Sequence, residues 1–146
     1  MTPLRAVLAA ATLAALAAAR PASAHGPELG LGADWLVDPD SGELQLTLGV
    51  ATHLARNVDL GVRFGVAWFD EADVVGVPID GRLRIRTGRL YLEGLVGPWI
   101  LFDSGDSVQL HAAIGFGLQS RSLSFGLEVG VLEDTSMVGV RVAFPL

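Results

Sequence analysis

Residues 108–131 read VQLHAAIGFGLQSRSLSFGLEVGV, and this stretch decides the fold. On either side of Ser120-Arg121, apolar residues alternate with small or polar ones. Successive side chains of a β-strand point to opposite faces, so a period of two predicts two strands, each with one apolar face. The stretch therefore predicts an antiparallel hairpin.

The same alternation recurs along the rest of the chain after residue 25. The eight segments that show it are 28–37, 44–53, 58–68, about 77–86, 89–102, 108–118, 123–131 and 138–146. Most are long enough for a tilted strand to cross a bilayer, which takes about 9–11 residues, whereas strands of soluble proteins average about 5–6. The pattern predicts an all-β fold, an eight-stranded antiparallel up-and-down transmembrane β-barrel.

Residues 1–24 have the composition of a secretory signal peptide. A lone early Arg5 is followed by an apolar run over residues 6–19, and the segment ends in Ala22-Ser23-Ala24. That ending is the small-x-small pattern that signal peptidase accepts. The apolar run is short for a membrane span of about 20 residues, so an N-terminal anchor is the less favoured alternative. We expect cleavage after Ala24, export, and one barrel domain over residues 25–146.

Cysteine content and charge narrow the classes of function. The chain has no cysteine, so it has no disulfide and no cysteine to carry a lipid anchor. It also has no lysine; without Arg5 and Arg20, 8 of the 10 arginines remain against 16 acids, a net charge of −8. Nucleic acid is not an expected partner, because its phosphates require cations.

Three tight connections allow the strand register to be predicted. They are a two-residue turn at Thr87-Gly88, a two-residue turn at Ser120-Arg121, and a three-residue loop Ala55-Arg56-Asn57 in which Asn57 is able to take the left-handed conformation. The cross-strand pairs that follow are Arg84–Tyr91, Arg82–Glu93, Phe116–Phe125, Gly115–Gly126, Ala113–Glu128 and His53–Asp59. All three hairpins keep their apolar residues on one face, as a consistent register must.

The other four connections are acidic. They cover residues 38–43, 70–73, 103–106 and 133–136, and they hold ten of the sixteen acids and no arginine. Alternate connections of an up-and-down sheet lie at opposite ends, so Arg56, Arg89 and Arg121 of the tight turns should lie at the far end. We expect a barrel that is polarised in charge along its axis.

Alternation alone does not say which face is buried, and a soluble lipocalin-like barrel would turn its apolar face inward. Two features favour the opposite arrangement. The second face is crowded with Gly, Ala and Ser, which suit the cramped interior of an eight-stranded barrel, and its charges nearly balance, as buried charges must. The residues expected to form this ionic network in the lumen are Asp34, Asp59, Arg63, Arg82, Arg84, Arg86, Glu93, Glu128 and Arg141, together with His53, His111 and, by phase, Glu28 and Asp80.

Aromatic residues and prolines give two further expectations. Trp35, Trp68 and Phe102 fall on the apolar face near the acidic connections, where they should form an aromatic belt at the membrane surface. Pro78 and Pro98 have no N–H to donate, so pairing should loosen beside them. The assumed register places Pro98 opposite Val77, at the mouth of the barrel.

With these features the chain resembles the small outer-membrane barrels of the OmpA-transmembrane and OmpX type, by pattern over nearly all of residues 25–146. In that family the last strand alternates and ends in an aromatic residue that the barrel-insertion machinery reads. Here residues 138–144 alternate, but Pro145-Leu146 departs from that ending. The resemblance implies an outer-membrane location among membrane lipid and lipopolysaccharide, contact with the insertion machinery through the C-terminal strand, and tight turns and both termini on the periplasmic side.

Catalytic residues are not expected. His53 and His111 face the lumen by phase, and a histidine opposite an aspartate could act as a general base. Ser107, Ser122 and Ser124 are close to them only in sequence, and the His-x-Ser arrangement of lipid A deacylases is absent. We therefore expect no enzyme activity and no cofactor.

No metal site is expected either. The acidic stretches 38–43 and 103–106 match no EF-hand loop, so weak binding of divalent cations is the most that they suggest. The sequence thus predicts an outer-membrane barrel with a polar, side-chain-filled lumen and a non-catalytic role in envelope structure, surface interaction or a narrow pore. A soluble periplasmic lipocalin-like barrel that binds an apolar ligand is the alternative, and a lipid A-modifying enzyme is less favoured.

Overall fold

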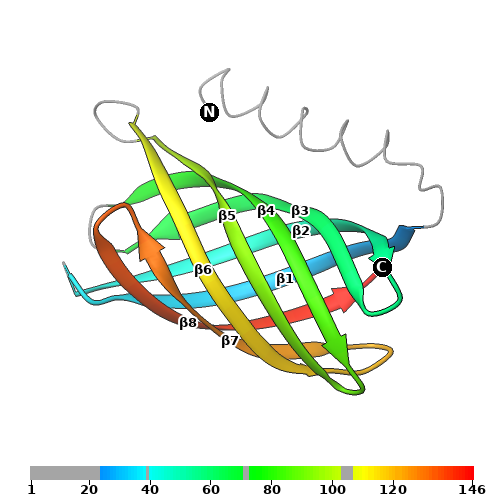
Figure 1. Cartoon of the computed structure of the whole chain (residues 1–146). Coiled ribbons are helices and arrows are strands. Elements are labelled where there is room, and N and C mark those ends of the chain that lie inside the picture. The colour runs from blue at the N-terminus through cyan, green and yellow to red at the C-terminus, as the bar shows by residue number, and fades with distance from the viewer. Residues whose placement is uncertain (1–23, 39, 71–72, 103–106) are drawn as a thin grey trace.

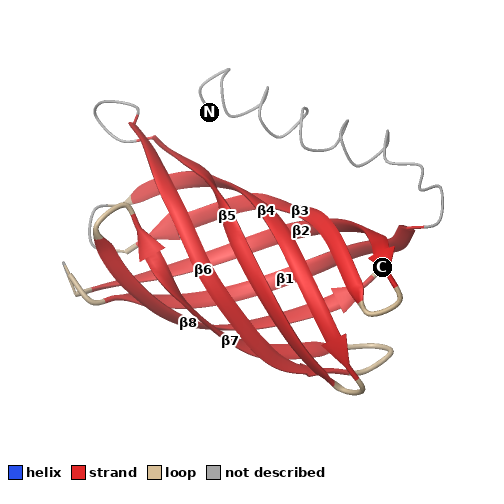
Figure 2. Cartoon of the chain, viewed as in Figure 1, coloured by secondary structure: helices blue, strands red, loops and turns tan. Residues whose placement is uncertain are grey.

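The computed structural model describes residues 24–38, 40–70, 73–102 and 107–146 as eight strands in one closed barrel (Figures 1 and 2). Each strand pairs antiparallel with its chain neighbours, and β8 returns to pair with β1. The strands are β1 (Ala24–Leu36), β2 (Ser41–Ala55), β3 (Val58–Phe69), β4 (Val74–Thr87), β5 (Leu90–Phe102), β6 (Ser107–Gln119), β7 (Ser124–Leu132) and β8 (Thr135–Pro145). The predicted fold class is confirmed.

The predicted signal peptide lies outside the described residues except for Ala24, the first residue of β1. Within the described ranges, no helix has both the length and the hydropathy that a membrane span requires.

The apolar face of the barrel points outward. Leu110 is 62% exposed and Ile114 is 60% exposed, whereas Glu128 is 1% exposed and Asp80 is fully buried. This distribution is the reverse of that in a soluble protein, where large apolar side chains are mostly buried and carboxylates are rarely so. The apolar-outward prediction is confirmed, and the apolar-lined interior of a lipocalin-like barrel is excluded.

The β2–β3 hairpin pairs His53 with Asp59, as predicted, but closes differently. Ala55 pairs with Val58, so the turn is Arg56-Asn57. The extra residue, Leu54, is accommodated by an irregularity in the β2–β3 pairing between His53 and Ala55. Asn57, which could have taken the left-handed conformation in a three-residue loop, is not among the described residues with positive φ.

The registers predicted for the other two hairpins were wrong by two residues. The β4–β5 turn is Gly88-Arg89, with Gly88 at φ 61°, and Arg84 faces Glu93 where Tyr91 was expected. The β6–β7 connection is longer than two residues, because Gln119 pairs with Ser124, and this sets Gly115 opposite Glu128. A slip of one residue would turn every side chain to the other face, but a slip of two leaves each side chain on its predicted face.

Both prolines interrupt a ladder, as their missing N–H groups require. The β3–β4 pairing is absent between Phe64–Ile79 and Ala67–Gly76, the stretch that contains Pro78. The β4–β5 pairing is absent between Pro78–Trp99 and Gly81–Val96. Val77 faces Ile100, so the predicted apposition of Pro98 with Val77 was wrong.

Two glycines of β5 should respond in opposite ways to replacement by alanine. A Cβ on Gly97 would overlap the Ile79 carbonyl oxygen, whereas a Cβ on Gly94 would have no heavy atom within 4 Å. Gly97→Ala should therefore destabilise the barrel by about 1–3 kcal/mol through forced backbone movement, and Gly94→Ala should be neutral or slightly stabilising. Urea unfolding of both variants in lipid vesicles measures the difference; equal stabilities would contradict the close β4–β5 approach.

Candidate functional site: the charged lumen and its mouth

The lumen is filled in layers that follow the inward residues of β4. Val74 lies at the end of the barrel that carries the acidic connections, Asp80 lies further in, and Arg82, Arg84 and Arg86 lead to the tight-turn end. We name these three layers, in that order, the apolar plug, the central cluster and the mouth cluster. The apolar plug is Leu36, Ala67, Phe69, Val74, Trp99, Leu101, Leu132 and Met137. The central cluster is Asp34, Arg63, Asp80, His111, Glu128 and Arg141, and the mouth cluster is Glu28, Asp59, Arg82, Arg84, Arg86 and Glu93.

Glu128 of β7 joins the two arginines of the central cluster. Arg63 donates to its two carboxylate oxygens, Nη1 at 2.8 Å and Nη2 at 3.2 Å, and Arg141 Nη2 donates from 3.0 Å. The Arg141 Nη2 atom also lies 2.7 Å from Asp34 Oδ2. All four side chains are at least nine-tenths buried. Strands β1, β3, β7 and β8 are thus tied together across the lumen.

Asp80 of β4 is another carboxylate of the central cluster with several partners. Arg63 Nη2 donates to it at 2.9 Å and the Trp99 indole N–H donates at 3.1 Å. His111 Nδ1 lies 2.7 Å from Asp80 Oδ1, and the His111 and Trp99 rings pack with centroids 4.6 Å apart. Asp80, Trp99 and His111 are all fully buried, so this carboxylate has exchanged water for three protein donors.

The mouth cluster continues the pairing toward the tight turns. Arg82 Nη1 donates to Glu28 at 2.7 Å, and Arg84 donates to Glu28 at 3.3 Å and to Glu93 at 2.8 Å. The Arg84 guanidinium also lies over the Tyr91 ring, 4.4 Å from its centroid, in cation–π geometry.

At the outer edge of the mouth cluster, Arg86 pairs with Asp59 at 2.8 Å. His53 Nδ1 lies 2.6 Å from the same carboxylate, and the His53 side chain is 43% exposed. His53 therefore lies at the rim, in water, and not inside the lumen with His111.

Sequence reasoning missed two lumen residues, Glu43 and Trp99. Glu43 was assigned to an acidic connection, but β2 begins at Ser41 and Glu43 points inward, 1% exposed. Gln45 donates to Asp34 at 3.1 Å and to Glu43 at 3.2 Å. Trp99 has the phase of Glu93 on β5, a signal that could have placed it in the lumen.

The expectation of a polar lumen holds only for part of its length. Toward the acidic connections the interior is the apolar plug: Leu36, Ala67, Phe69, Val74, Trp99, Leu101, Leu132 and Met137, all buried. Phe69 packs edge-on against Trp99 with ring centroids 6.4 Å apart. These side chains close this end of the barrel as a small hydrophobic core.

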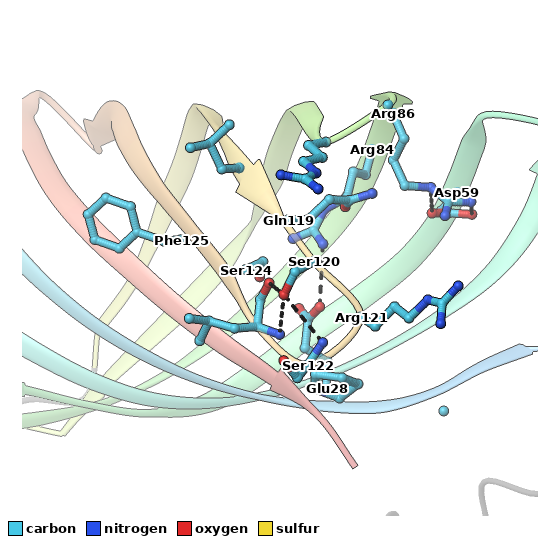
Figure 3. A pocket seen from close by; sticks show the side chains of 16 residues that line it. Glu28, Asp59, Arg84, Arg86, Gln119, Ser120, Arg121, Ser122, Ser124 and Phe125 are labelled. Carbon is cyan, nitrogen blue, oxygen red and sulfur yellow. Dashed lines mark hydrogen bonds and ion pairs between the residues drawn. The ribbon is translucent and has the colours of Figure 1, made fainter.

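The tight-turn end is open. A cavity of about 1110 Å³ lies there, above the mouth cluster (Figure 3). The polar and charged residues that line it are Glu28, Asp59, Arg84, Arg86, Arg89, Gln119, Ser120, Arg121, Ser122 and Ser124. It is a water-accessible vestibule with a charged floor.

The aromatic residues singled out from the sequence lie on the outer face. Trp35 is 49% exposed, Trp68 is 42% exposed and Phe102 is partly exposed. The Trp68 indole N–H donates to Asp73 Oδ1 at 3.1 Å, so this ring has an apolar body and a polar tip near the acidic connections.

The histidines and serines are not assembled into a nucleophilic site around His111. Ser124 pairs with Gln119 at the tight-turn end of β7, whereas His111 pairs with Leu132 at the opposite end of that strand. Within residues 24–38, 40–70, 73–102 and 107–146, no group of three or more His, Asp or Glu residues is placed to hold a metal ion. The acidic stretch 103–106 lies outside these ranges, as do Pro39, Glu71 and Ala72.

Comparisons with known proteins identify the fold. No protein-family model matches the sequence, and no curated protein matches it. Among solved structures, a chain from a study of de novo designed transmembrane β-barrels aligns with a TM-score of 0.59 and 14% identity, over 84% of this chain and 96% of that one. The designed barrel TMB2.3 aligns with a TM-score of 0.59 and 15% identity, over 87% of this chain and 98% of that one. The N-terminal β-barrel domain of Pseudomonas aeruginosa OprF aligns with a TM-score of 0.54 and 11% identity, over 82% of this chain and 96% of that one.

These neighbours share the fold at sequence identities too low to carry a function. The chain has the architecture of a small eight-stranded transmembrane barrel, consistent with the OmpA/OmpX type that its sequence pattern resembles.

Proposed function

We propose that this protein is exported to the outer membrane and serves there as a non-catalytic barrel of the cell envelope, with a lumen closed to ions. The observation that carries the proposal is the pairing of an apolar exterior with a sealed interior. Leu46, Ile114 and Leu127 are among the large apolar side chains exposed around the barrel, and lipid is the environment in which such a surface is stable.

Heat-modifiability tests location and fold together. The protein is extracted in detergent from the membrane fraction of expressing cells and run on SDS gels with and without boiling. A closed barrel should resist SDS until boiled and therefore shift in mobility. A chain recovered from the soluble periplasmic fraction, with no shift, would contradict the proposal.

Conductance tests the closed lumen. The central cluster fills the middle of the barrel with paired side chains, and the apolar plug closes one end, so ions have no continuous water path even though the mouth is open. Purified protein in a planar lipid bilayer is expected to give no stepwise conductance above the protein-free bilayer. Steady single-channel steps would support a narrow pore instead.

The non-catalytic part of the proposal is supported by how the polar groups are used. Asp80 already accepts from three partners, and His111 is fully buried beside it. A lipid substrate would have to displace these contacts to reach either group. Lipid A from cells with and without the protein should therefore have the same acyl composition.

We propose further that the partners are those of a membrane barrel: outer-membrane lipid, lipopolysaccharide, and the insertion machinery, which would read β8. Val138, Val140 and Phe144 of β8 point outward and are exposed, as a lipid-facing C-terminal strand requires. Divalent cations should bridge the acidic connections to lipopolysaccharide only weakly, because the acids there form no three-ligand group within the described residues.

A further inference from the structure

Three arginines remain outside the ion-pair network. Arg63, Arg82, Arg84, Arg86 and Arg141 all pair with carboxylates in the lumen. Within the part of the chain that the structure describes, Arg56, Arg89 and Arg121 have no ion-pair or hydrogen-bond partner for their side chains. All three are exposed and lie in the tight turns. They are therefore free to bind an anion from outside the protein.

The turns that carry Arg89 and Arg121 are joined by a backbone hydrogen bond. The backbone N–H of Gln119 donates to the Arg89 carbonyl at 2.7 Å, which ties the β4–β5 turn to the start of the β6–β7 connection that holds Arg121. Arg89 and Arg121 both line the vestibule, and Arg56 does not. Two exposed guanidinium groups in the lining of one cavity are suited to a phosphate, whose oxygens match their planar donors.

The vestibule leads over this rim into an apolar groove on the lipid-facing surface. Leu118 and Phe125 line both the vestibule and the groove. The groove measures about 610 Å³ and lies over β4 to β7, with Ile85, Leu92 and Phe116 among its walls. A polar cavity that carries positive charge is thus continuous with an apolar one.

A second apolar depression of about 660 Å³ follows on the same four strands and reaches Leu60 of β3. Its walls, Leu83, Gly94 and Ile114 among them, occupy the next outward positions along the strands. From Leu90 to Val96 a strand advances roughly 20 Å at about 3.4 Å per residue. At a tilt of about 40° this is roughly 15 Å of depth, one leaflet of a hydrocarbon core about 30 Å thick.

We propose that this face binds one anionic phospholipid of the leaflet at the tight-turn end, with its phosphate between Arg89 and Arg121 and an acyl chain in the groove over β4 to β7. The inference rests on the proposed membrane location. A second copy of the chain fits the face less well. A two-fold axis along the membrane normal would bring the Arg89 and Arg121 side chains of both copies to the same height, where like charges repel.

Native mass spectrometry of the membrane-extracted protein tests the headgroup site. It is titrated with dipalmitoyl phosphatidylglycerol and with dipalmitoyl phosphatidylcholine, which differ only in the headgroup. The wild type should bind one phosphatidylglycerol more tightly than phosphatidylcholine. The double variant Arg89→Gln/Arg121→Gln should lose affinity for phosphatidylglycerol by roughly fivefold for each arginine removed. Arg56→Gln, which removes the same charge from another tight turn, should bind as the wild type does.

Filling the second depression tests the acyl-chain site. Gly94 lines that depression, and a Cβ there would meet no heavy atom within 4 Å, so Gly94→Leu should fold normally and occupy the depression. Displacing two methylenes of the chain would weaken binding of the dipalmitoyl lipid by roughly tenfold, while binding of dihexanoyl phosphatidylglycerol stays unchanged. Ala33→Leu, at an exposed outward position of β1, is the matched control and should have no effect.

The outcomes separate the two proposals. Each variant is first run unboiled and boiled on SDS gels. A wild type without a heat shift would defeat the proposed function itself. A normal shift with equal affinity for both dipalmitoyl lipids, or an Arg56→Gln loss equal to that of the double variant, would overturn the lipid site alone.

Discussion

Replacing Glu128 with glutamine is expected to cost about 3 kcal/mol of stability, the low end of the range for breaking a buried ion pair. The glutamine has nearly the same shape, but it leaves the guanidiniums of Arg63 and Arg141 facing a neutral group where each now lies within 3.0 Å of a carboxylate oxygen. The loss should stay near 3 kcal/mol because Arg63 keeps its ion pair with Asp80 and Arg141 keeps its ion pair with Asp34.

Urea unfolding in lipid vesicles measures this cost, with Glu133→Gln as the control. Glu133 is an exposed acid in the connection between β7 and β8. Its replacement by glutamine removes the same charge. Its effect should stay within about 0.5 kcal/mol. If both variants lose the same stability, the central cluster contributes no more than overall charge does.

Leu127→Arg is expected to destabilise the inserted barrel by about 2–4 kcal/mol and to block its assembly in cells. Leu127 lies in the middle of β7, faces outward and is 40% exposed, between Phe116 of β6 and Val140 of β8. An arginine there would sit in hydrocarbon with no carboxylate on the outer face to pair with it.

Ser122→Arg adds the same charge to the β6–β7 connection, outside the apolar band, and should assemble normally. The readouts are the amount of heat-modifiable protein in the membrane fraction and the unfolding free energy in vesicles. Normal assembly of Leu127→Arg would argue against a lipid-facing surface at this position, because the folded barrel would then tolerate a charge where hydrocarbon was expected.

Much of the fold could be predicted because a strand's period of two is local. The alternation of Val138, Val140 and Phe144 with Gly139 and Arg141 assigns each residue to a face without knowledge of its partners. Few folds other than a barrel accommodate a long series of such segments. The many small residues of the second face and its nearly balanced charges then favoured an outward apolar face.

Exact partners were harder to predict because registers that differ by two residues put the same side chains on the same face. The turn at Gly88-Arg89 is favoured over Thr87-Gly88 by a contact between strands, since it aligns Arg84 with Glu93. Glu43 was missed for a related reason: the boundary between an acidic connection and β2 is set by pairing with β1 and β3 and not by composition.

By itself, the sequence determined the strand count, the face of most residues, the polarity of charge along the axis and the identity of most lumen charges. Only the tertiary structure decided which charges meet, as when Arg63 reaches Glu128 across 65 residues. It also decided that Trp99 and its neighbours plug one end and leave the other open. The physical reason is that alternation is a property of one strand, whereas the height at which opposite walls meet depends on the closure of β1 onto β8 and the stagger of the whole barrel.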